Sequence, residues 1–251
     1  VLESIETLEE WGTRFVPPRI EEGKAKVAEN DAIALETARA VGPSPLAGHH
    51  VVVTSGATKE PIDPVRVLTN RASGRTGRAV ARACYARGAT VTLVHDGPDV
   101  PYAEVRQAET TEEMIDAVES ATATADALVS AAAISDYTMD AVGEKIRSGQ
   151  EELNIDLLPT PKLLDRIRGA YPDLTMVGFK VETSGDDDAM VEAARGIIDR
   201  VGLAFVVAND ASVMGEADTR TLFVRSSSVE AFQGSKAELG LRVADELAAE
   251  L

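Results

Sequence analysis

The hydrophobic and polar positions of this chain form two alternating patterns from about residue 46 onward. Short apolar runs predict buried strands, and longer stretches with apolar residues three and four apart predict amphipathic helices. The sequence predicts strands at 50–55, 89–94, 127–133, 175–180 and 204–208, and helices at 79–87, 112–121, 161–168 and 189–201. A short alternating strand at 153–158, an apolar segment at 219–225 and a final helix at 235–251 complete the pattern.

Strands that alternate with helices of this length predict parallel pairing through right-handed crossovers. We therefore expect an α/β fold, in which a doubly wound, mostly parallel Rossmann-like sheet carries helices on both faces. Residues 1–47 differ, because they contain a short helix at 5–11, a double-proline break and a helix at 31–41, with no strand pattern. We expect 1–47 to be the tail of a preceding domain with its linker, and 48–251 to be the main domain.

The chain is acidic, with a formal net charge of −17 and a sequence pI near 4.6. Nonspecific binding to nucleic acid or to anionic membranes depends on clustered Lys and Arg, so we expect neither partner. No stretch is long and apolar enough to span a bilayer, and the acidic start does not resemble a signal peptide. The single cysteine, Cys84, lies among small apolar residues, which indicates a buried, inert thiol and a cytoplasmic location.

The stretch from Thr69 to Gly77 joins glycines, hydroxyls and cations where an apolar strand passes into a helix. Unpaired N–H groups and the dipole at a helix start favour anions, so Gly74 and Gly77 predict a phosphate-binding turn. A Gly-x-x-Gly turn by itself equally serves tight packing. The long polar insertion at 56–66 fits a simple Gly-x-Gly-x-x-Gly dinucleotide site poorly, because such a site enters its helix almost directly from the strand.

Polar residues also follow the later strands, at the edge where open α/β sheets bind ligands. Asp136 follows the third strand, where it either caps a loop or binds a metal ion, a nucleotide or a substrate amide. Lys145 lies in a polar loop and either faces solvent or neutralises phosphate. Phe179 is either part of the core or a stacking surface for a base. Lys236, at the start of the last helix, either extends along the surface or reaches phosphate.

Other kinds of site fit the sequence less well. The three histidines have no metal-ligand spacing with Cys84, which argues against zinc, and the Gly-x-Ser-x-Gly elbow of a hydrolase is lacking. A nicotinamide-dependent oxidoreductase stays an alternative, because Asp96 follows the second strand where a ribose-binding acid would lie. A noncatalytic nucleotide-binding module is a third class.

Taken together, these motifs closely resemble those of the phosphopantothenoylcysteine synthetase domain, the ligase half of a bifunctional coenzyme A biosynthesis protein that also carries a decarboxylase. The resemblance covers residues 46–251 and depends on separated motifs in the family's order: 54–66, Asn70 with Ser73, Gly74 and Gly77, 131–133 with Asp136 and Tyr137, Lys145 with Ile146, Gly178 with Phe179, and 208–210. It implies that FMN belongs to the decarboxylase domain, outside this chain, and that this chain does not decarboxylate.

The resemblance implies a reaction that joins 4′-phosphopantothenate to L-cysteine. The carboxylate attacks the α-phosphate of CTP to give an acyl-cytidylate and pyrophosphate, and the cysteine amine then displaces CMP. Asn70 resembles the asparagine that holds the carboxylate and the acyl intermediate, and Lys145 resembles the mobile-loop lysine of the first step. Contacts to substrate or nucleotide are implied for Gly56, Thr58, Ser73, Gly74, Arg75, Gly77, Ala133, Asp136, Phe179, Lys180, Asn209, Asp210 and Lys236.

The resemblance also implies cofactors and partners. Mg²⁺ would be held mainly by the triphosphate, with Asp136 as a candidate ligand. Bacterial members often carry a denser lysine run at the mobile loop, where this chain has only Lys145 and Arg147. Lys180 resembles the residue of eukaryotic and some archaeal members, and the eukaryotic ones use ATP, so ATP stays an alternative to CTP. Family members dimerise, and residues 142–158 are our candidates for the flap and interface of a homodimer.

Overall fold

The computed structural model describes residues 2–149, 151–182, 186–210 and 218–251. The chain forms two compact units, Val1–Pro43 and Ser44–Leu251.

The N-terminal unit contains α1 (Leu2–Glu10), a hairpin of β1 (Arg19–Glu21) and β2 (Lys24–Lys26), and α2 (Asn30–Val41). The expectation that this region has no strand was wrong. The two turn residues of the hairpin, Glu22 and Gly23, have φ angles of 51° and 73°, as a two-residue hairpin turn favours. All residues of both strands are exposed, so no alternation of buried and exposed positions marks them in the sequence.

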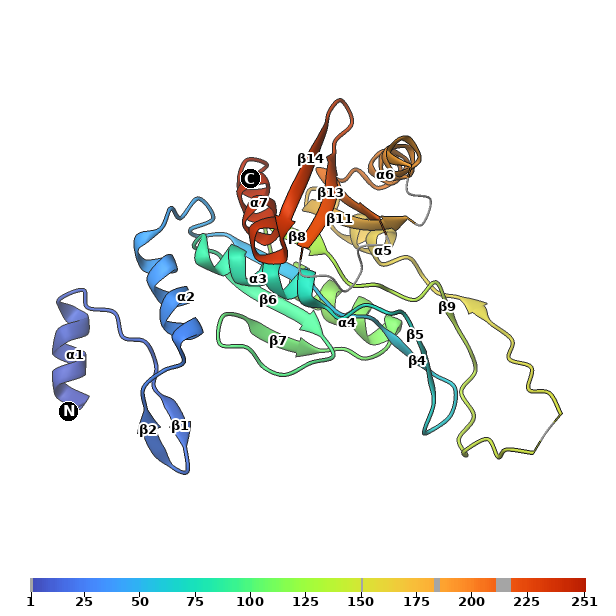
Figure 1. The fold of residues 1–251 in the computed structure, drawn as a ribbon, viewed down its shortest axis with the longest axis horizontal. Coiled ribbons are helices and arrows are strands. Elements are labelled where there is room, and N and C mark those ends of the chain that lie inside the picture. The colour runs from blue at the N-terminus through green and yellow to red at the C-terminus, as the bar shows by residue number, and fades with distance from the viewer. Residues whose placement is uncertain (1, 150, 183–185, 211–217) are drawn as a thin grey trace. The chain divides into compact units, whose positions relative to one another are not determined.

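The main unit is built on an eight-stranded sheet (Figure 1). From one edge to the other, its strands are β14 (Val229–Ser235), β13 (Asp218–Val224), β12 (Phe205–Asp210), β11 (Thr175–Glu182), β8 (Ala127–Ser130), β3 (His50–Thr54), β6 (Thr90–His95) and β7 (Glu104–Gln107). The strands from β12 to β7 pair in parallel, whereas β13 and β14 pair antiparallel. The predicted doubly wound, mostly parallel sheet is therefore confirmed.

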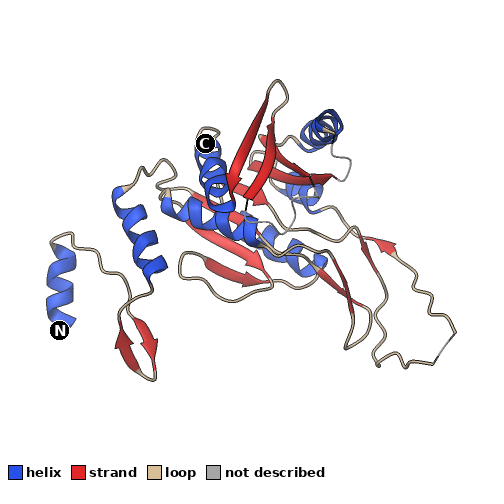
Figure 2. Ribbon diagram, in the orientation of Figure 1, coloured by secondary structure: helices blue, strands red, loops and turns tan. Residues whose placement is uncertain are grey.

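Helices cover both faces of this sheet (Figure 2). One face packs against α3 (Arg75–Ala86) and α7 (Lys236–Ala248), and the other against α4 (Thr111–Thr122), α5 (Leu163–Ala170) and α6 (Asp187–Val201). Within β3, Val51 and Val53 face the α3 side and Val52 faces the α4 side. Because both faces are buried, the central strands are continuous apolar runs, which is the pattern that revealed them in the sequence.

Two predicted elements have different bounds or a different structure. α3 begins at Arg75 rather than at residue 79, because its first turn is polar and carries no apolar periodicity. The strand predicted at 153–158 was wrong, since only β10 (Leu158–Pro159) forms there and pairs with β9 (Tyr137–Thr138). The alternating residues Leu153, Ile155 and Leu157 are exposed, so their period-two pattern has no buried face in a single chain.

The sequence analysis also missed strands whose residues are largely exposed. β7 and β14 are the two edges of the sheet, and neither has a fully buried residue. A short hairpin of β4 (Lys59–Pro61) and β5 (Val67–Thr69) lies in the insertion after β3. Pairing of such strands is decided by their neighbours in space, which local hydrophobicity does not report.

Candidate functional site

The connection from β3 to α3 forms a tight turn against the end of β3. Gly74 precedes α3 with a φ angle of +71°, and Ser55 Oγ donates a hydrogen bond of 2.8 Å to its carbonyl oxygen. A Cβ atom on Gly77 would lie 2.7 Å from the Thr54 carbonyl oxygen, so only glycine allows this approach. The unpaired N–H groups that start α3 are thereby held beside the carboxyl end of β3, where they can bind an anion.

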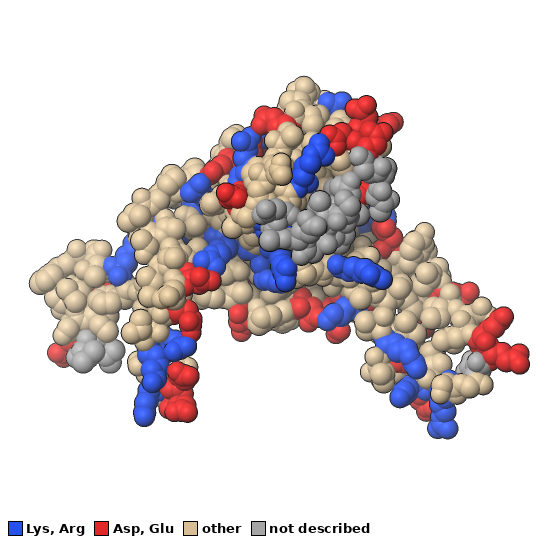
Figure 3. Space-filling view, viewed as in Figure 1, with Lys and Arg blue, Asp and Glu red and all other residues tan. Residues whose placement is uncertain are grey.

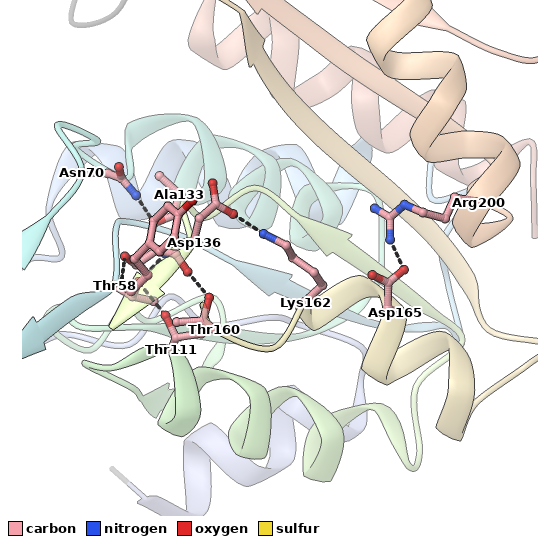
Figure 4. A network of polar contacts seen from close by, with 11 residues as sticks. Thr58, Asn70, Thr111, Ala133, Asp136, Thr160, Lys162, Asp165 and Arg200 are labelled. Atoms are coloured by element: carbon pink, nitrogen blue, oxygen red, sulfur yellow. Dashed lines mark hydrogen bonds and ion pairs between the residues drawn. The ribbon is translucent and has the colours of Figure 1, made fainter. Parts of the chain in front are cut away.

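The residues that follow β3 and β8 are joined by hydrogen bonds. Ala133 N donates to Gly56 O at 2.9 Å, and Thr58 N donates to Ala133 O at 3.2 Å. Asn70 Nδ2 lies 3.3 Å from the same Ala133 oxygen, and Figure 4 shows the side chain directed toward it. Three residues that the sequence singled out, Gly56, Asn70 and Ala133, therefore meet at one point although they lie far apart in the chain.

A cavity of about 240 Å³ opens beside this point. It is lined by Gly56, Ala57, Lys59, Thr69, Asn70, Ala72, Ser73, Arg78, His95 and Asp96. The cavity thus lies between the insertion after β3, the glycine turn and the end of β6. It includes Gly56, Asn70 and Ser73 from the residues that the sequence predicted.

Charged side chains face one another in this cavity. Lys59 Nζ pairs with Asp96, and this hydrogen bond raises the pKa of Lys59 although partial burial lowers it. Burial and the nearby charge of Arg78 lower the pKa of His95 and so favour its neutral imidazole. Arg78 lies one turn into α3 and donates to Ser73 O at 3.1 Å. The cavity therefore presents a guanidinium next to the anion-binding turn.

Sequence reasoning missed Lys59 and Arg78. Arg78 follows Gly74 by four residues, so a cation in the first turn after a glycine-rich helix start was a signal available in the sequence. Lys59 had no such signal, because its partner Asp96 comes from the end of another strand.

Two buried polar residues of the insertion, Thr58 and Glu60, form hydrogen bonds to the turn after β8 and to the start of α4. Thr58 is fully buried, and its Oγ1 accepts from Ser135 N at 2.9 Å and lies 3.1 Å from Thr111 Oγ1 (Figure 4). Glu60 is also buried and accepts from Thr111 N at 2.9 Å. The structure thus places Thr58, predicted to contact ligand, where its side chain orients the turn after β8.

A larger cavity of about 540 Å³ opens on the α4 side of Glu60. It is lined by Glu60, Pro61, Thr110, Thr111, Glu112, Ile115, Asp116, Thr138, Met139, Thr160, Pro161 and Arg166. It contains none of the residues that the sequence predicted, and its lining combines three carboxylates with a single arginine. We therefore regard the smaller cavity, at the glycine turn, as the candidate site.

Other predicted residues lie on neighbouring strand ends but do not line this cavity. Asp136 is exposed and pairs with Lys162 (Figure 4). Phe179 is partly buried against the core on the α3 side, and Lys180 Nζ lies 3.1 Å from Glu182 Oε1. Asp136 follows β8, and Phe179 and Lys180 lie in the carboxyl-terminal half of β11, the strand that pairs with β8.

The remaining predicted residues lie at the ends of β12, α3 and α7. Asn209 Oδ1 is buried and has no hydrogen-bond partner among the residues described, and the side chain of Asp210 lies outside the described part. Arg75 is exposed at the first position of α3. Lys236 begins α7, and the N-terminus of this helix is capped by a capping box between Ser235 and Glu238.

Lys145 lies in an exposed loop that is attached to the β4–β5 hairpin rather than to the cavity. Val142 N donates to Ile62 O at 3.1 Å, and Ile146 N donates to Asp63 Oδ2 at 3.0 Å. Lys145 itself is exposed and forms no ion pair with the residues that the structure describes. Within one chain, the structure does not bring Lys145 into the cavity with Asn70.

Some candidate chemistry is not supported by side-chain geometry. Within the described ranges, no three His, Cys, Asp or Glu residues are grouped so that they could hold a metal ion. Cys84 is buried, as the sequence predicted, and burial raises the pKa of its thiol to about 12. The helices in the described part of the chain are too short or too polar to cross a membrane.

On the face in Figure 3, Lys and Arg are interspersed with Asp and Glu, so the excess negative charge does not form one acidic patch there.

Known proteins share this architecture. A solved structure described as the DNA/pantothenate metabolism flavoprotein from Streptococcus pneumoniae has a TM-score of 0.74 and 23% sequence identity, covering 81% of this chain and all of that one. The C-terminal domain of coenzyme A biosynthesis bifunctional protein CoaBC has a TM-score of 0.68 and 24% identity, covering 82% of this chain and 97% of that one. At these identities the likeness shows the fold.

Sequence comparisons are more specific. A bifunctional protein CoaBC of Thermococcus kodakarensis is 41% identical over 98% of this chain, and one of Methanocaldococcus jannaschii is 31% identical over 93%. The chain spans 62% and 59% of the length of these two relatives. The family profile described as the DNA/pantothenate metabolism flavoprotein C-terminal domain matches residues 46–251. The chain therefore belongs to the family of the DNA/pantothenate metabolism flavoprotein C-terminal domain.

Proposed function

We propose that this chain is a phosphopantothenate–cysteine ligase of coenzyme A biosynthesis. The observation that carries the proposal is the hydrogen bond from Asn70 to Ala133 O, made beside a cavity that Asn70 lines together with Ser73 and Arg78 of the glycine turn and α3. Relatives that match nearly the whole chain are named as bifunctional coenzyme A biosynthesis proteins, which supports this reaction over a nicotinamide-dependent one. Asp96, the acid that suggested a ribose contact, is paired with Lys59.

In the proposed first step, a carboxylate oxygen of 4′-phosphopantothenate attacks the α-phosphorus of CTP. The bond from that phosphorus to the β-phosphate oxygen breaks, and pyrophosphate leaves. The N–H groups at the start of α3, with Gly74 and Gly77 allowing close approach, hold phosphate oxygens, and Arg78 offsets their charge. The Asn70 amide orients the carboxylate, since a neutral amide donates a hydrogen bond without repelling the anion.

In the proposed second step, the amine of cysteine attacks the acyl carbon, CMP leaves, and the amine loses a proton. Asn70 remains beside the acyl group and keeps its carbonyl oriented for attack. Lys145 serves the first step, in which negative charge accumulates as pyrophosphate departs. Mg²⁺ would be held mainly by the triphosphate, with the exposed carboxylate of Asp136 as a candidate protein ligand, and would offset the remaining phosphate charge.

We further propose a homodimer and a cytoplasmic location. The segment 142–158 exposes Val142, Leu153, Ile155, Leu157 and Leu158, an apolar set that a second copy of the chain would cover. A second copy would also bring a loop with Lys145 near a site that one chain leaves without it. The buried, reduced Cys84 is compatible with a reducing compartment.

The test is pyrophosphate release from the purified chain with 4′-phosphopantothenate, Mg²⁺ and either CTP or ATP, with and without cysteine. Release that requires phosphopantothenate but not cysteine would support acyl activation, and the better nucleotide would decide between CTP and ATP. Release of CMP or AMP on addition of cysteine would support the second step. No release with either nucleotide from folded dimer would refute the proposed function.

A further inference from the structure

Asp63 is a buried carboxylate that the proposed reaction leaves without a role. It lies in the β4–β5 hairpin, and its side chain is 0% exposed. Its two oxygens accept hydrogen bonds from two separate sources. Oδ1 accepts from Val65 N and Arg66 N, both at 2.8 Å, which closes the turn of the hairpin.

The second oxygen of Asp63 reaches across to the loop that carries Lys145. Oδ2 accepts from Ile146 N at 3.0 Å and from the Arg66 guanidinium. The same guanidinium donates to Ile146 O at 3.1 Å. Both backbone polar groups of Ile146 are therefore held by the Asp63–Arg66 pair, although 83 residues separate Asp63 from Ile146.

The hydrogen bonds between Asp63 and the loop are strong because the carboxylate that accepts them is ionised. Desolvation raises the pKa of Asp63, but the backbone N–H groups of Val65, Ile146 and Arg66 and the Arg66 guanidinium outweigh it and hold the pKa at about 2. The carboxylate is thus ionised at any working pH, and charge-assisted hydrogen bonds are the strong ones. The loop is otherwise exposed from residue 141 to 145, so its position depends on few contacts.

We propose that Asp63 is a positioning residue that fixes the loop at 142–146 by accepting a hydrogen bond from the Ile146 N–H, and so determines where the adjacent Lys145 is presented. The proposal rests on the proposed function for its catalytic consequence. The hydrogen bond between Asp63 and Ile146 does not depend on the proposed function, because it can be measured without enzyme turnover.

Two substitutions of Asp63 test the contact. Asp63→Ala removes every acceptor, and Asp63→Asn keeps the shape but supplies one acceptor oxygen where the carboxylate supplies two. We expect deuterium exchange of the Ile146 amide to accelerate by about tenfold or more in Asp63→Ala, because opening of the amide no longer breaks its hydrogen bond to Asp63. Unchanged exchange in both variants would overturn the proposal.

The catalytic part is tested by a double-mutant cycle with Lys145→Gln. We expect Asp63→Asn to lower kcat for pyrophosphate release by about 10- to 10²-fold with KM for the nucleotide little changed, as a misplaced catalytic group does. In the Lys145→Gln background the same substitution should have almost no further effect, because the group it positions is gone. Full additivity, or an unchanged kcat in Asp63→Asn, would overturn the positioning role.

The matched control is Asp126→Asn. Asp126 also accepts a backbone N–H from a distant segment, His50 N at 2.7 Å, but it lies at the opposite ends of β3 and β8. It should lower stability without changing Ile146 exchange. If the wild-type chain releases no pyrophosphate at all, the proposed function fails together with the catalytic role of the anchor, and the exchange experiment still decides whether the anchor exists.

Discussion

The glycine turn at 73–77 and the loop at 142–146 both lie in connections from a parallel strand to the next helix, yet they are held in different ways. The turn lies directly on β3, where Gly77 leaves no room for a side chain. The loop is exposed and is held through Asp63, from another connection. The position of the turn is therefore set by local packing, whereas the position of the loop is set by contacts to residues of another connection.

The largest expected effect is on the rate of pyrophosphate release, and it comes from replacing the exposed Lys145 of the loop. Lys145→Gln should slow pyrophosphate release by about 10²–10³-fold, as loss of a charge-stabilising donor does. The free energy of unfolding should not change, because the side chain is exposed. Stopped-flow pyrophosphate detection and urea unfolding measure the two quantities. The neighbouring Arg147→Gln is the control and should keep most of the rate; equal losses would mean that total loop charge, rather than Lys145, is what matters.

In the glycine turn, by contrast, we expect one substitution to lower both the free energy of unfolding and the affinity for nucleotide. Gly77→Ala places a methyl group against the Thr54 carbonyl and Ser55, and overpacking of this kind costs about 1–3 kcal/mol. Urea unfolding and nucleotide titration would measure it. Gly196→Ala is the control, because that helical position has open space and alanine there should stabilise by roughly 0.5–1 kcal/mol. A Gly77→Ala variant of normal stability would mean that β3 yields, and the turn is not rigid.

A pH series sharpens the description of the loop anchor. The pKa of Asp63 is lowered to about 2 from its ordinary value of 3.8, so its ionised form favours the folded state. Its contribution to stability is fully present above about pH 4 and is lost as pH falls toward 2. The stability difference between wild type and Asp63→Asn should therefore be constant from pH 7 to about 4 and shrink below that. A difference that grows on acidification would contradict the assignment.

The smallest effect concerns the charge of the whole chain rather than either loop. With a net charge of −17, repulsion among excess carboxylates should be screened by salt, so the melting temperature should rise by a few degrees as salt is added. Calorimetry from low to high salt measures this. A flat or falling melting temperature would show that the surface ion pairs contribute as much as the repulsion.

Local sequence was sufficient for the elements whose packing leaves a local pattern. β3, β6, β8, β11 and β12 were predicted because strands buried on both faces are continuous apolar runs, and the glycine turn was predicted because backbone approach at Gly74 and Gly77 demands glycine. Strands without a buried face, such as β1 and β14, left no such pattern. The alternation at 153–158 misled for the opposite reason, because its apolar residues are exposed in a single chain.

The sequence by itself therefore determined the fold class, the order of the motifs and the identity of Asn70, Gly74 and Lys145 as candidates. Only the tertiary structure decided which of them meet. It brought Asn70 to Ala133, buried Thr58 behind the site, paired Lys59 with Asp96, and joined Asp63 to Ile146. The reason is physical: a turn depends on the conformations of a few adjacent residues, whereas these contacts join groups that only the folded sheet brings within hydrogen-bonding distance.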